Sequence, residues 1–389
     1  MKHSFVMTRR TILNNGLQAA TLVALQHAAM ARPRRHDVEQ KVFVSSAEVP
    51  FLQFPEGITA WREHVYVGTY NFINPADSRI FVFEAESGAL KNTLGGKPGQ
   101  ELISAGAILG LAINPDTGDL YAAANGAGNI LRIQRPASAT PEISVYAAYP
   151  TGTPQPPGPE DLAWHKYGWL YASDSNNRRL YAIPPGGGRP WLVVGPAGSG
   201  AMISDQDLFA QPEPGFAPNG LVFSLDFRTL YAANTDTDAV IALDVGPDGM
   251  LTGKLRVLAQ NLNDAFTEEP VGFESLKGPN TKIGPSAATP LNGPDGLAID
   301  SRGRIWVASV FGDNLTVLNP DTGHVLFTIG SSALALGGLL RQPASLTFVG
   351  ERVLTTNLGL FQDPKTPSAM WSVVEFDVNV TGAGGNGNL

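Results

Sequence analysis

Four oxygen-bearing side chains occur at one recurring place along this chain of 389 residues: Glu56, Glu160, Asn219 and Asp295. Each directly follows a proline and opens an apolar stretch. Three are carboxylates, and two like charges about 4 Å apart repel by roughly 4 kcal/mol at an effective dielectric constant of 20. A cluster of them therefore needs either protons or a cation. Oxygen ligands without His or Cys suit one hard divalent ion, Ca²⁺ first, with Mg²⁺, Mn²⁺ and Zn²⁺ as alternatives.

A second explanation for these four residues is structural. Asn and Asp favour the backbone conformations of tight turns, so each side chain could simply cap the turn that it follows. For any single residue this explanation is the simpler one, but recurrence at four of six equivalent positions favours a metal site. The two equivalent positions without an oxygen donor, Leu109 and Ala344, fit an ion bound off the centre of the ring.

The recurring place is the start of a repeat. A repeat of about 40–50 residues that contains several strands is typical of a β-propeller blade. Six copies predict an all-β, six-bladed β-propeller in which the leading residues face a central channel. The six openings are Pro55-Glu56-Gly57-Ile58, Leu109-Gly110-Leu111-Ala112, Pro159-Glu160-Asp161-Leu162, Pro218-Asn219-Gly220-Leu221, Pro294-Asp295-Gly296-Leu297 and Pro343-Ala344-Ser345-Leu346.

Each opening is followed by further strand signals. Alternating apolar residues separated by Asp- and Gly-rich turns are typical of half-buried antiparallel strands. Second strands are predicted at 65–68, 120–123, 170–173, 230–233, 305–308 and 353–356, and third strands at 79–83, 129–133, 179–183, 239–243, 314–318 and 372–376. Residues 41–45 alternate as a strand before the first repeat. They are predicted to pair with the last strand and close the ring through the N- and C-terminal strands.

Composition narrows the class of protein and its partners. With 43% hydrophobic and 16% charged residues, 43 Gly and 30 Pro, the chain resembles a turn-rich globular β protein. A formal charge of −8 argues against nucleic acid as a partner. No uninterrupted apolar run reaches about 18 residues, so no membrane span is expected. The absence of cysteine excludes disulfides and thiol chemistry.

The N-terminus is predicted to be separate from the propeller. Arg9-Arg10 precedes a weakly apolar stretch that ends at Ala29-Met30-Ala31, which resembles a twin-arginine export signal. The alternative is a disordered basic segment. The predicted organisation is therefore an export signal at 1–31, a propeller at 32–384 and a tail at 385–389, with a periplasmic or secreted location.

The repeat openings also resemble a known family. The stretches that begin Pro218-Asn219-Gly220-Leu221 and Pro294-Asp295-Gly296-Leu297 look like the fourth- and fifth-blade motifs of the senescence marker protein, gluconolactonase and luciferin-regenerating enzyme family, and Glu56 before Gly57 resembles its first-blade glutamate. The resemblance covers about residues 41 to 380. It implies a six-bladed propeller, one divalent metal in the channel held by a Glu, one or two Asn and an Asp, and hydrolysis of lactones or related esters.

The third repeat departs from that family's pattern. Pro159-Glu160-Asp161 occupies the place of an Asn-containing stretch, and the neighbouring substrate-binding Arg is missing. The stretch also resembles strictosidine synthase-like propellers. Two functions from different classes therefore remain: a metal-dependent lactone or ester hydrolase with Asp295 as general base, and a non-catalytic exported binding or scaffold propeller with a structural ion. The expected partner is a small-molecule substrate, and no obligate protein partner is evident.

Two long connections complete the predictions. Segments 195–217 and 261–293 lead directly into the inner strands that begin near Asn219 and Asp295. They are predicted to wall the channel mouth and select the substrate. Long loops in compact domains are usually functional or disordered, and surface decoration without function is the alternative.

Overall fold

The computed structural model describes residues 34–35, 40–71, 78–95, 102, 106–206, 208–209, 217–260, 290–329, 339–359 and 371–383. The chain divides into two compact units, Met1–Arg35 and His36–Leu389. In the first unit only the short strand β1 (Arg34–Arg35) is described. The predicted export signal at 1–31, the tail at 385–389 and the boundaries of the predicted propeller lie outside the described residues, so this organisation stays a prediction.

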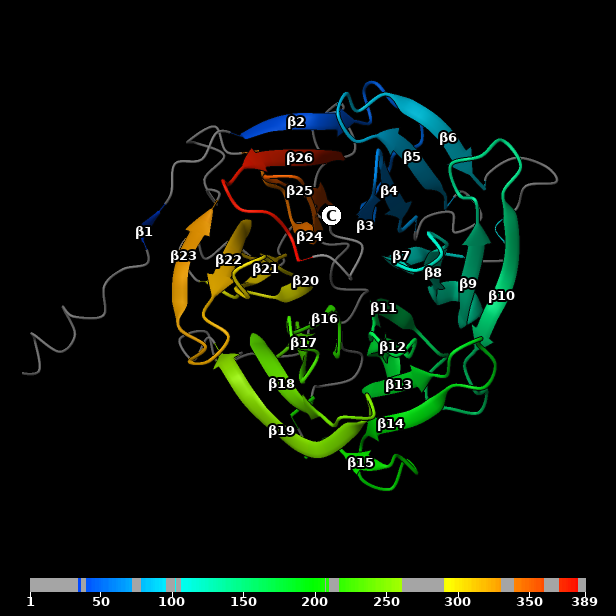
Figure 1. Cartoon of the computed structure of the whole chain (residues 1–389), viewed down its shortest axis with the longest axis vertical. Coiled ribbons are helices and arrows are strands. Elements are labelled where there is room, and N and C mark those ends of the chain that lie inside the picture. Colours follow the sequence, from blue (N-terminus) through cyan, green and yellow to red (C-terminus); the bar gives the residue numbers. More distant parts are fainter. Residues whose placement is uncertain are drawn as a thin grey trace, which may run out of the picture. The chain divides into compact units, whose positions relative to one another are not determined.

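Among the described residues, the second unit folds as six antiparallel sheets arranged around a central axis (Figure 1). Blade 1 contains β3 (Pro55–Trp61), β4 (His64–Thr69), β5 (Ile80–Glu84) and β6 (Leu90–Leu94). Blade 2 contains β7 (Ile108–Ile113), β8 (Leu120–Ala124), β9 (Asn129–Gln134) and β10 (Glu142–Ala148). Blade 3 contains β11 (Pro159–Trp164), β12 (Leu170–Asp174), β13 (Arg179–Ile183), β14 (Trp191–Gly195) and the parallel strand β15 (Ile203–Ser204).

The remaining three blades repeat this arrangement. Blade 4 contains β16 (Leu221–Phe223), β17 (Thr229–Asn234), β18 (Ala239–Val245) and β19 (Leu251–Gln260). Blade 5 contains β20 (Pro294–Ile299), β21 (Ile305–Ser309), β22 (Asn314–Leu318) and β23 (Val325–Ile329). Blade 6 contains β24 (Pro343–Val349), β25 (Arg352–Asn357) and β26 (Ser372–Asp377). Short 3-10 turns, Asn125–Ala127 and Ser175–Asn177, follow β8 and β12.

The ring closes as predicted. Strand β2 (Gln40–Ser45) pairs antiparallel with β26 and completes blade 6, with Ser45 opposite Ser372. This pairing of an N-terminal strand with the C-terminal strand of the same blade gives β26 a partner on each side, so it has no free edge. The prediction of a six-bladed all-β propeller is therefore confirmed.

The hydrophobic core consists of slabs between neighbouring blades. Six buried clusters each combine residues of two adjacent sheets; one packs Ile80 and Val82 of blade 1 against Ile108 and Leu131 of blade 2. The inner strands are buried along nearly their whole length, because they contact a sheet on either side and the channel in front. A seventh cluster does not follow this pattern and lies at one end of the channel.

A bulge begins the inner strand of five of the six blades in the described residues. In blade 1, Pro55 pairs with Thr69 and Ile58 pairs with Val67. The inner strand therefore advances by three residues where its partner advances by two. The same shift occurs at the equivalent residues of blades 2, 3, 5 and 6. A bulge inserts one residue and redirects a side chain. The redirected residues are the leading residue of each repeat and the one after it.

The segment 195–217 is only partly described. Its strand β15 lies at the outer edge of blade 3 (Figure 1), while Phe209 is buried between blades 3 and 4. Asn234 Nδ2 donates to the carbonyl of Leu208, which ties this segment to the end of β17. Most of 261–293 lies outside the described residues, so its predicted role at the channel mouth stays a prediction. No described helix is long and apolar enough to cross a membrane.

Candidate metal and active site in the channel

The four predicted donors come together at one end of the channel. Glu56, Glu160, Asn219 and Asp295 keep only 6%, 9%, 5% and 6% of their surface exposed. Glu56, Glu160 and Asp295 belong to blades 1, 3 and 5, which are not neighbours, yet the charges of Asp295 and Glu160 raise the pKa of Glu56, and the charge of Glu160 also raises that of Asp295. Side chains of non-adjacent blades can interact only across the channel. The leading residues therefore form a ring, here called the donor ring, together with Leu109 and Ala344.

The carboxylates of the donor ring hold their protons strongly. Burial raises the pKa of Glu56 well above its usual value, and Asp295, Glu160 and Asp161 raise it further. The pKa of Asp295 is raised by burial first, then by Glu160 and Asp161. Burial raises the pKa of Glu160 to about 8, which a hydrogen bond from Ser175 partly offsets. No cationic side chain contributes to these shifts, so the negative charges are uncompensated within the described residues.

Neighbouring polar groups orient three of the four donors. Ser175 Oγ donates to Glu160 Oε2 at 2.7 Å. Asn219 Nδ2 donates to Thr235 Oγ1 at 3.1 Å, and the Thr235 hydroxyl donates to the carbonyl of Pro294 at 2.8 Å. This arrangement leaves Asn219 Oδ1 as the amide oxygen that could bind a cation. A hydrogen bond from Asn219 also lowers the pKa of Asp295, opposing the effect of burial.

Glu56 is the exception. Its Oε2 is buried and has no hydrogen-bond partner within the described part of the chain. A buried polar atom without a partner costs about 1–3 kcal/mol, so native proteins rarely retain one unless something else binds there. The unpaired oxygen faces a ring in which every other charge is also negative. Both observations fit a cation as the missing partner.

The sequence analysis missed one carboxylate, Asp161. Four of the six residues that follow the leading position are glycines, and a Cβ at Gly57 or Gly220 would collide with the carbonyl of the next blade's leading residue. Blade 3 instead has Asp161, whose Oδ2 accepts a hydrogen bond from the backbone N–H of Leu221 in blade 4 at 2.7 Å. Burial raises the pKa of Asp161 to about 7. The break in the glycine pattern was the available signal.

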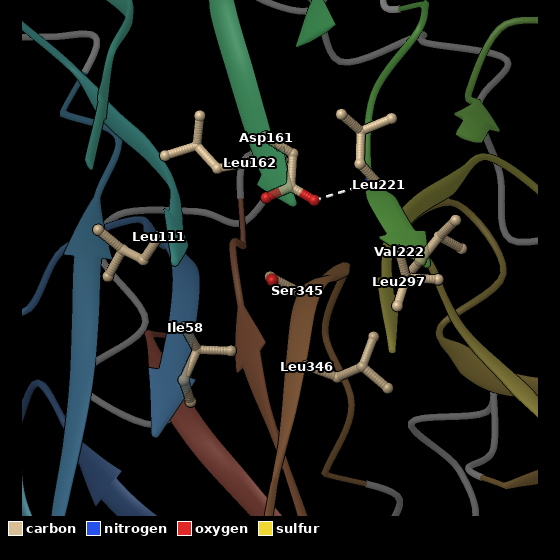
Figure 2. A pocket seen from close by; sticks show the side chains of 9 residues that line it. All are labelled: Ile58, Leu111, Asp161, Leu162, Leu221, Val222, Leu297, Ser345 and Leu346. Carbon is tan, nitrogen blue, oxygen red and sulfur yellow. Dashed lines mark hydrogen bonds between the residues drawn. The ribbon is translucent and has the colours of Figure 1, made fainter. Parts of the chain in front are cut away.

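Beyond the donor ring, aliphatic side chains close the channel. Each inner strand contributes one of them two residues after its leading residue, and Asp161 and Ser345 point into the small cavity that they surround (Figure 2). This aliphatic ring consists of Ile58, Leu111, Leu162, Leu221, Leu297 and Leu346. The cavity measures about 20 Å³, room for roughly one water molecule. Within the described residues, this aliphatic ring narrows the channel on one side of the donor ring.

The donor ring fits a divalent cation by its chemistry, although no arranged site is formed. Across the described ranges, no group of three or more His, Cys, Asp or Glu side chains is positioned to hold a metal ion. The candidate set relies on an amide as well as on carboxylates, and it contains the unpaired Glu56 oxygen. Three buried carboxylates and one amide oxygen without a compensating cation are the kind of donors that Ca²⁺ binds.

Two histidines in the described part of the chain, His165 and His64, lie away from the donor ring. His165 is buried at the opposite end of β11, where its Nδ1 accepts a hydrogen bond from the Tyr167 N–H at 3.3 Å. Burial lowers its pKa. His64 begins β4, also away from the leading residues. Both positions agree with a turn role rather than with catalysis.

Comparisons with known proteins agree with this architecture. The family model described as the SMP-30/gluconolactonase/LRE-like region matches residues 54–355. No curated protein sequence matches the chain. A calcium-binding regucalcin from Agrobacterium tumefaciens is 16% identical with a TM-score of 0.57, covering 89% of this chain and 96% of that one.

Two further solved structures share the fold. A gluconolactonase from Xanthomonas campestris is 17% identical with a TM-score of 0.54, covering 90% of this chain and 93% of that one. A luciferin-regenerating enzyme is 15% identical with a TM-score of 0.53, covering 85% and 92%. At these identities the likeness shows the fold alone. Because the family model spans the six repeats, the chain belongs to the SMP-30/gluconolactonase/LRE-like family.

Proposed function

We propose that this protein is a hydrolase of lactones or related esters that uses one divalent cation, Ca²⁺ in the first place, bound by Glu56, Glu160, Asn219 and Asp295. The observation that carries the proposal is the uncompensated donor ring, in which three buried carboxylates interact across the channel and Glu56 Oε2 has no partner in the described chain. Family membership and gluconolactonases among the structural neighbours support the choice of substrate class.

The donor ring supplies the groups that ester hydrolysis needs. When bound, a divalent cation would polarise the ester carbonyl and stabilise the negative charge that develops on its oxygen. Asp295 is the proposed general base. Burial, Glu160 and Asp161 raise its pKa, and the hydrogen bond from Asn219 opposes this rise only in part. A bound cation would favour the ionised form that accepts a proton.

The proposed reaction balances with water as the only co-reactant. Asp295 accepts a proton from a water molecule as the water oxygen bonds to the carbonyl carbon. The bond between that carbon and the ring oxygen then breaks, and the proton passes from Asp295 to the leaving alkoxide. The product is a hydroxy acid.

A substrate screen with matched variants tests the proposal. Purified protein would be assayed on small γ- and δ-lactones by proton release, with added Ca²⁺ and after treatment with chelator. We expect hydrolysis that chelator abolishes and Ca²⁺ restores. Asp116→Asn is a matched control, because Asp116 is an exposed aspartate in the turn after the inner strand of blade 2. Turnover that survives chelation and Asp295→Asn would overturn the proposal.

We also propose that residues 1–31 direct export, because Arg9-Arg10 and Ala29-Met30-Ala31 frame an apolar stretch. Fractionation of cells expressing the full chain provides the test. A periplasmic protein whose N-terminus is Arg32 supports export, and an uncleaved cytoplasmic protein contradicts it.

A further inference from the structure

The seventh hydrophobic cluster differs from the other six in where it lies. It joins buried Phe54, Val310, Ala344 and Leu358 with the half-buried rings of Tyr70, Phe311 and Trp371. These residues come from blades 1, 5 and 6, whereas each of the other clusters fills the space between two sheets. Ala344 is itself a member of the donor ring. This group, the mouth cluster, therefore borders the candidate site directly.

Backbone hydrogen bonds fix the mouth cluster beside the leading residues. The N–H of Tyr70 donates to the carbonyl of Phe54 at 2.8 Å, just before Glu56. The N–H of Val310 donates to the carbonyl of Gly293 at 2.8 Å, just before Asp295. In blade 6, the N–H of Leu358 donates to the carbonyl of Gln342, just before Ala344. Each apolar residue thus lies within a few residues of the donor ring in three consecutive blades.

The equivalent residues of all six blades form a collar with two unlike halves. The collar contains the residue that follows the second strand of each blade: Tyr70, Asn125, Ser175, Thr235, Val310 and Leu358. In blades 2, 3 and 4 this residue is polar, and its side chain bonds to the leading segment of its own or the next blade. In blades 5, 6 and 1 it is apolar or aromatic. The donors are therefore oriented by polar groups on one side, and the other side carries apolar and aromatic residues, of which Tyr70 keeps part of its ring exposed.

The half-buried aromatic rings give this surface its shape. Trp371 packs against Phe54 with ring centroids 4.6 Å apart. Phe311 lies over Gly293, where a Cβ would collide with its ring. Tyr70 is close enough to Glu56 and Glu160 that their charges raise the pKa of its hydroxyl, in addition to the larger effect of burial. The aromatic surface and the donor ring therefore belong to one continuous site.

We propose that the mouth cluster binds an apolar substituent of the substrate, so that the preferred lactones or esters carry an alkyl chain rather than hydroxyl groups. This assignment of substrate class rests on the hydrolase function proposed above. An ester carbonyl at the donor ring would place its substituent against Tyr70, Phe311 or Trp371, because the polar half of the collar is occupied by its own hydrogen bonds. Burial of an alkyl chain against these rings is favourable in proportion to the apolar area removed from water.

Equilibrium binding of uncleavable analogues tests the subsite without requiring turnover. In 3-alkylcyclopentanones a methylene replaces the ring oxygen of the corresponding γ-lactone. Calorimetric titration of the Ca²⁺-loaded full chain with the methyl to hexyl members should show the dissociation constant falling about fourfold per added methylene. The heat-capacity change of binding should also become more negative along the series, which marks apolar burial.

Three variants assign the effect to the mouth cluster. Phe311→Ala and Trp371→Ala should each reduce the gain to about twofold or less per methylene, and Phe311→Leu should restore most of it. Tyr167→Ala is the matched control, since Tyr167 is a 53% exposed aromatic at the opposite end of blade 3. It should retain the wild-type dependence on chain length.

The outcomes separate this subsite from the hydrolase function. The subsite is overturned if the dissociation constant of the wild type does not depend on alkyl chain length. It is also overturned if this dependence is equally steep in Phe311→Ala and Trp371→Ala. If the dependence is present and sensitive to these variants but no 4-alkyl-γ-butyrolactone is hydrolysed, the subsite holds and the proposed hydrolase is wrong. If hydrolysis occurs and favours hydroxylated over alkyl lactones, the hydrolase holds and the assigned substrate class is wrong.

Discussion

Two successive rings of the same six strands differ in regularity. The donor ring changes residue type from blade to blade, as Glu56, Leu109, Glu160, Asn219, Asp295 and Ala344. Two residues further along each strand, the aliphatic ring contains only Ile and Leu. Each blade must fill the channel equally for the propeller to close, so the fold demands uniform residues. A single ligand bound off the centre of the channel contacts the blades unequally, so it requires different residue types in different blades. We infer that the symmetric ring maintains the fold and that the asymmetric ring carries the function.

The largest expected effect is on turnover, through the donor ring. Asp295→Asn should lower kcat/KM for a lactone by about 10²- to 10⁴-fold, because removing a general base typically costs that much. Initial rates at saturating Ca²⁺ provide the measurement, and thermal unfolding confirms that the variant is folded. Activity within threefold of the parent would show that Asp295 is not the base.

The aliphatic ring should respond in stability instead. Leu297→Ala should lower the free energy of unfolding by about 2–5 kcal/mol, since Leu297 is 7% exposed and its truncation leaves a cavity. Denaturant titration measures this loss. The amount of calcium bound per folded chain should stay unchanged. Loss of the ion from a folded Leu297→Ala protein would contradict the separation of a structural aliphatic ring from a functional donor ring.

Removal of Glu56 should abolish the stabilising effect of calcium. At a free ion concentration of 100 times the dissociation constant, binding to the folded state stabilises the parent by about 2.7 kcal/mol. Glu56→Gln should show little of this gain. In chelator the same variant should be as stable as the parent or more stable, because a neutral amide replaces a buried carboxyl group that Asp295 and Glu160 repel when it is ionised. A full calcium response in Glu56→Gln would contradict its assignment as a ligand.

The chelated protein should lose stability as pH rises. The folded-state pKa of Glu160 is about 8 and that of Asp161 about 7, both above their ordinary values. Their stabilising contribution is therefore complete below about pH 4 and is lost as pH rises through 7 to 8. We expect a fall of about 5–7 kcal/mol between pH 5 and pH 8, which added Ca²⁺ reverses. If the midpoint of denaturant unfolding in chelator does not change between pH 5 and pH 8, the carboxyl groups of Glu160 and Asp161 are not buried without a compensating charge.

A smaller effect should follow from loosening one donor. Thr235→Val removes the hydroxyl that bonds Asn219 and the carbonyl of Pro294. A buried hydrogen bond contributes about 1 kcal/mol, so calcium affinity should fall roughly fivefold. Calorimetric titration detects this change. Thr237→Val serves as the control, because Thr237 lies two residues further along the same hairpin and its backbone N–H bonds to Asn234 rather than to the donor ring.

The repeat pattern was sufficient to predict the fold. The six openings gave the blade number, and residues 41–45 correctly predicted that β2 closes the ring beside β26. These predictions succeeded because alternation of apolar residues and turn chemistry are local and are repeated in every blade. The convergence of Glu56, Glu160 and Asp295 followed from their equivalence in the repeat.

Features that break the repeat were harder to predict. Asp161 was not predicted as a site residue, because the hydrogen bond that it accepts from the Leu221 N–H depends on how blades 3 and 4 approach each other. The mouth cluster combines Tyr70, Val310 and Leu358, which are distant in sequence and share only a position in their blades. Such contacts depend on tertiary packing, which no local pattern contains. The roles of the donor-ring residues as ligands stay predictions.

The most direct test of the central claim is the calcium content of three purified proteins. After dialysis against Ca²⁺ and removal of free ion, elemental analysis of the parent, Asp295→Ala and Leu297→Ala would be compared. The account predicts about one Ca²⁺ per chain in the parent and in Leu297→Ala, and none in Asp295→Ala. An ion retained by Asp295→Ala, or absent from the parent, would contradict a divalent cation bound by the donor ring.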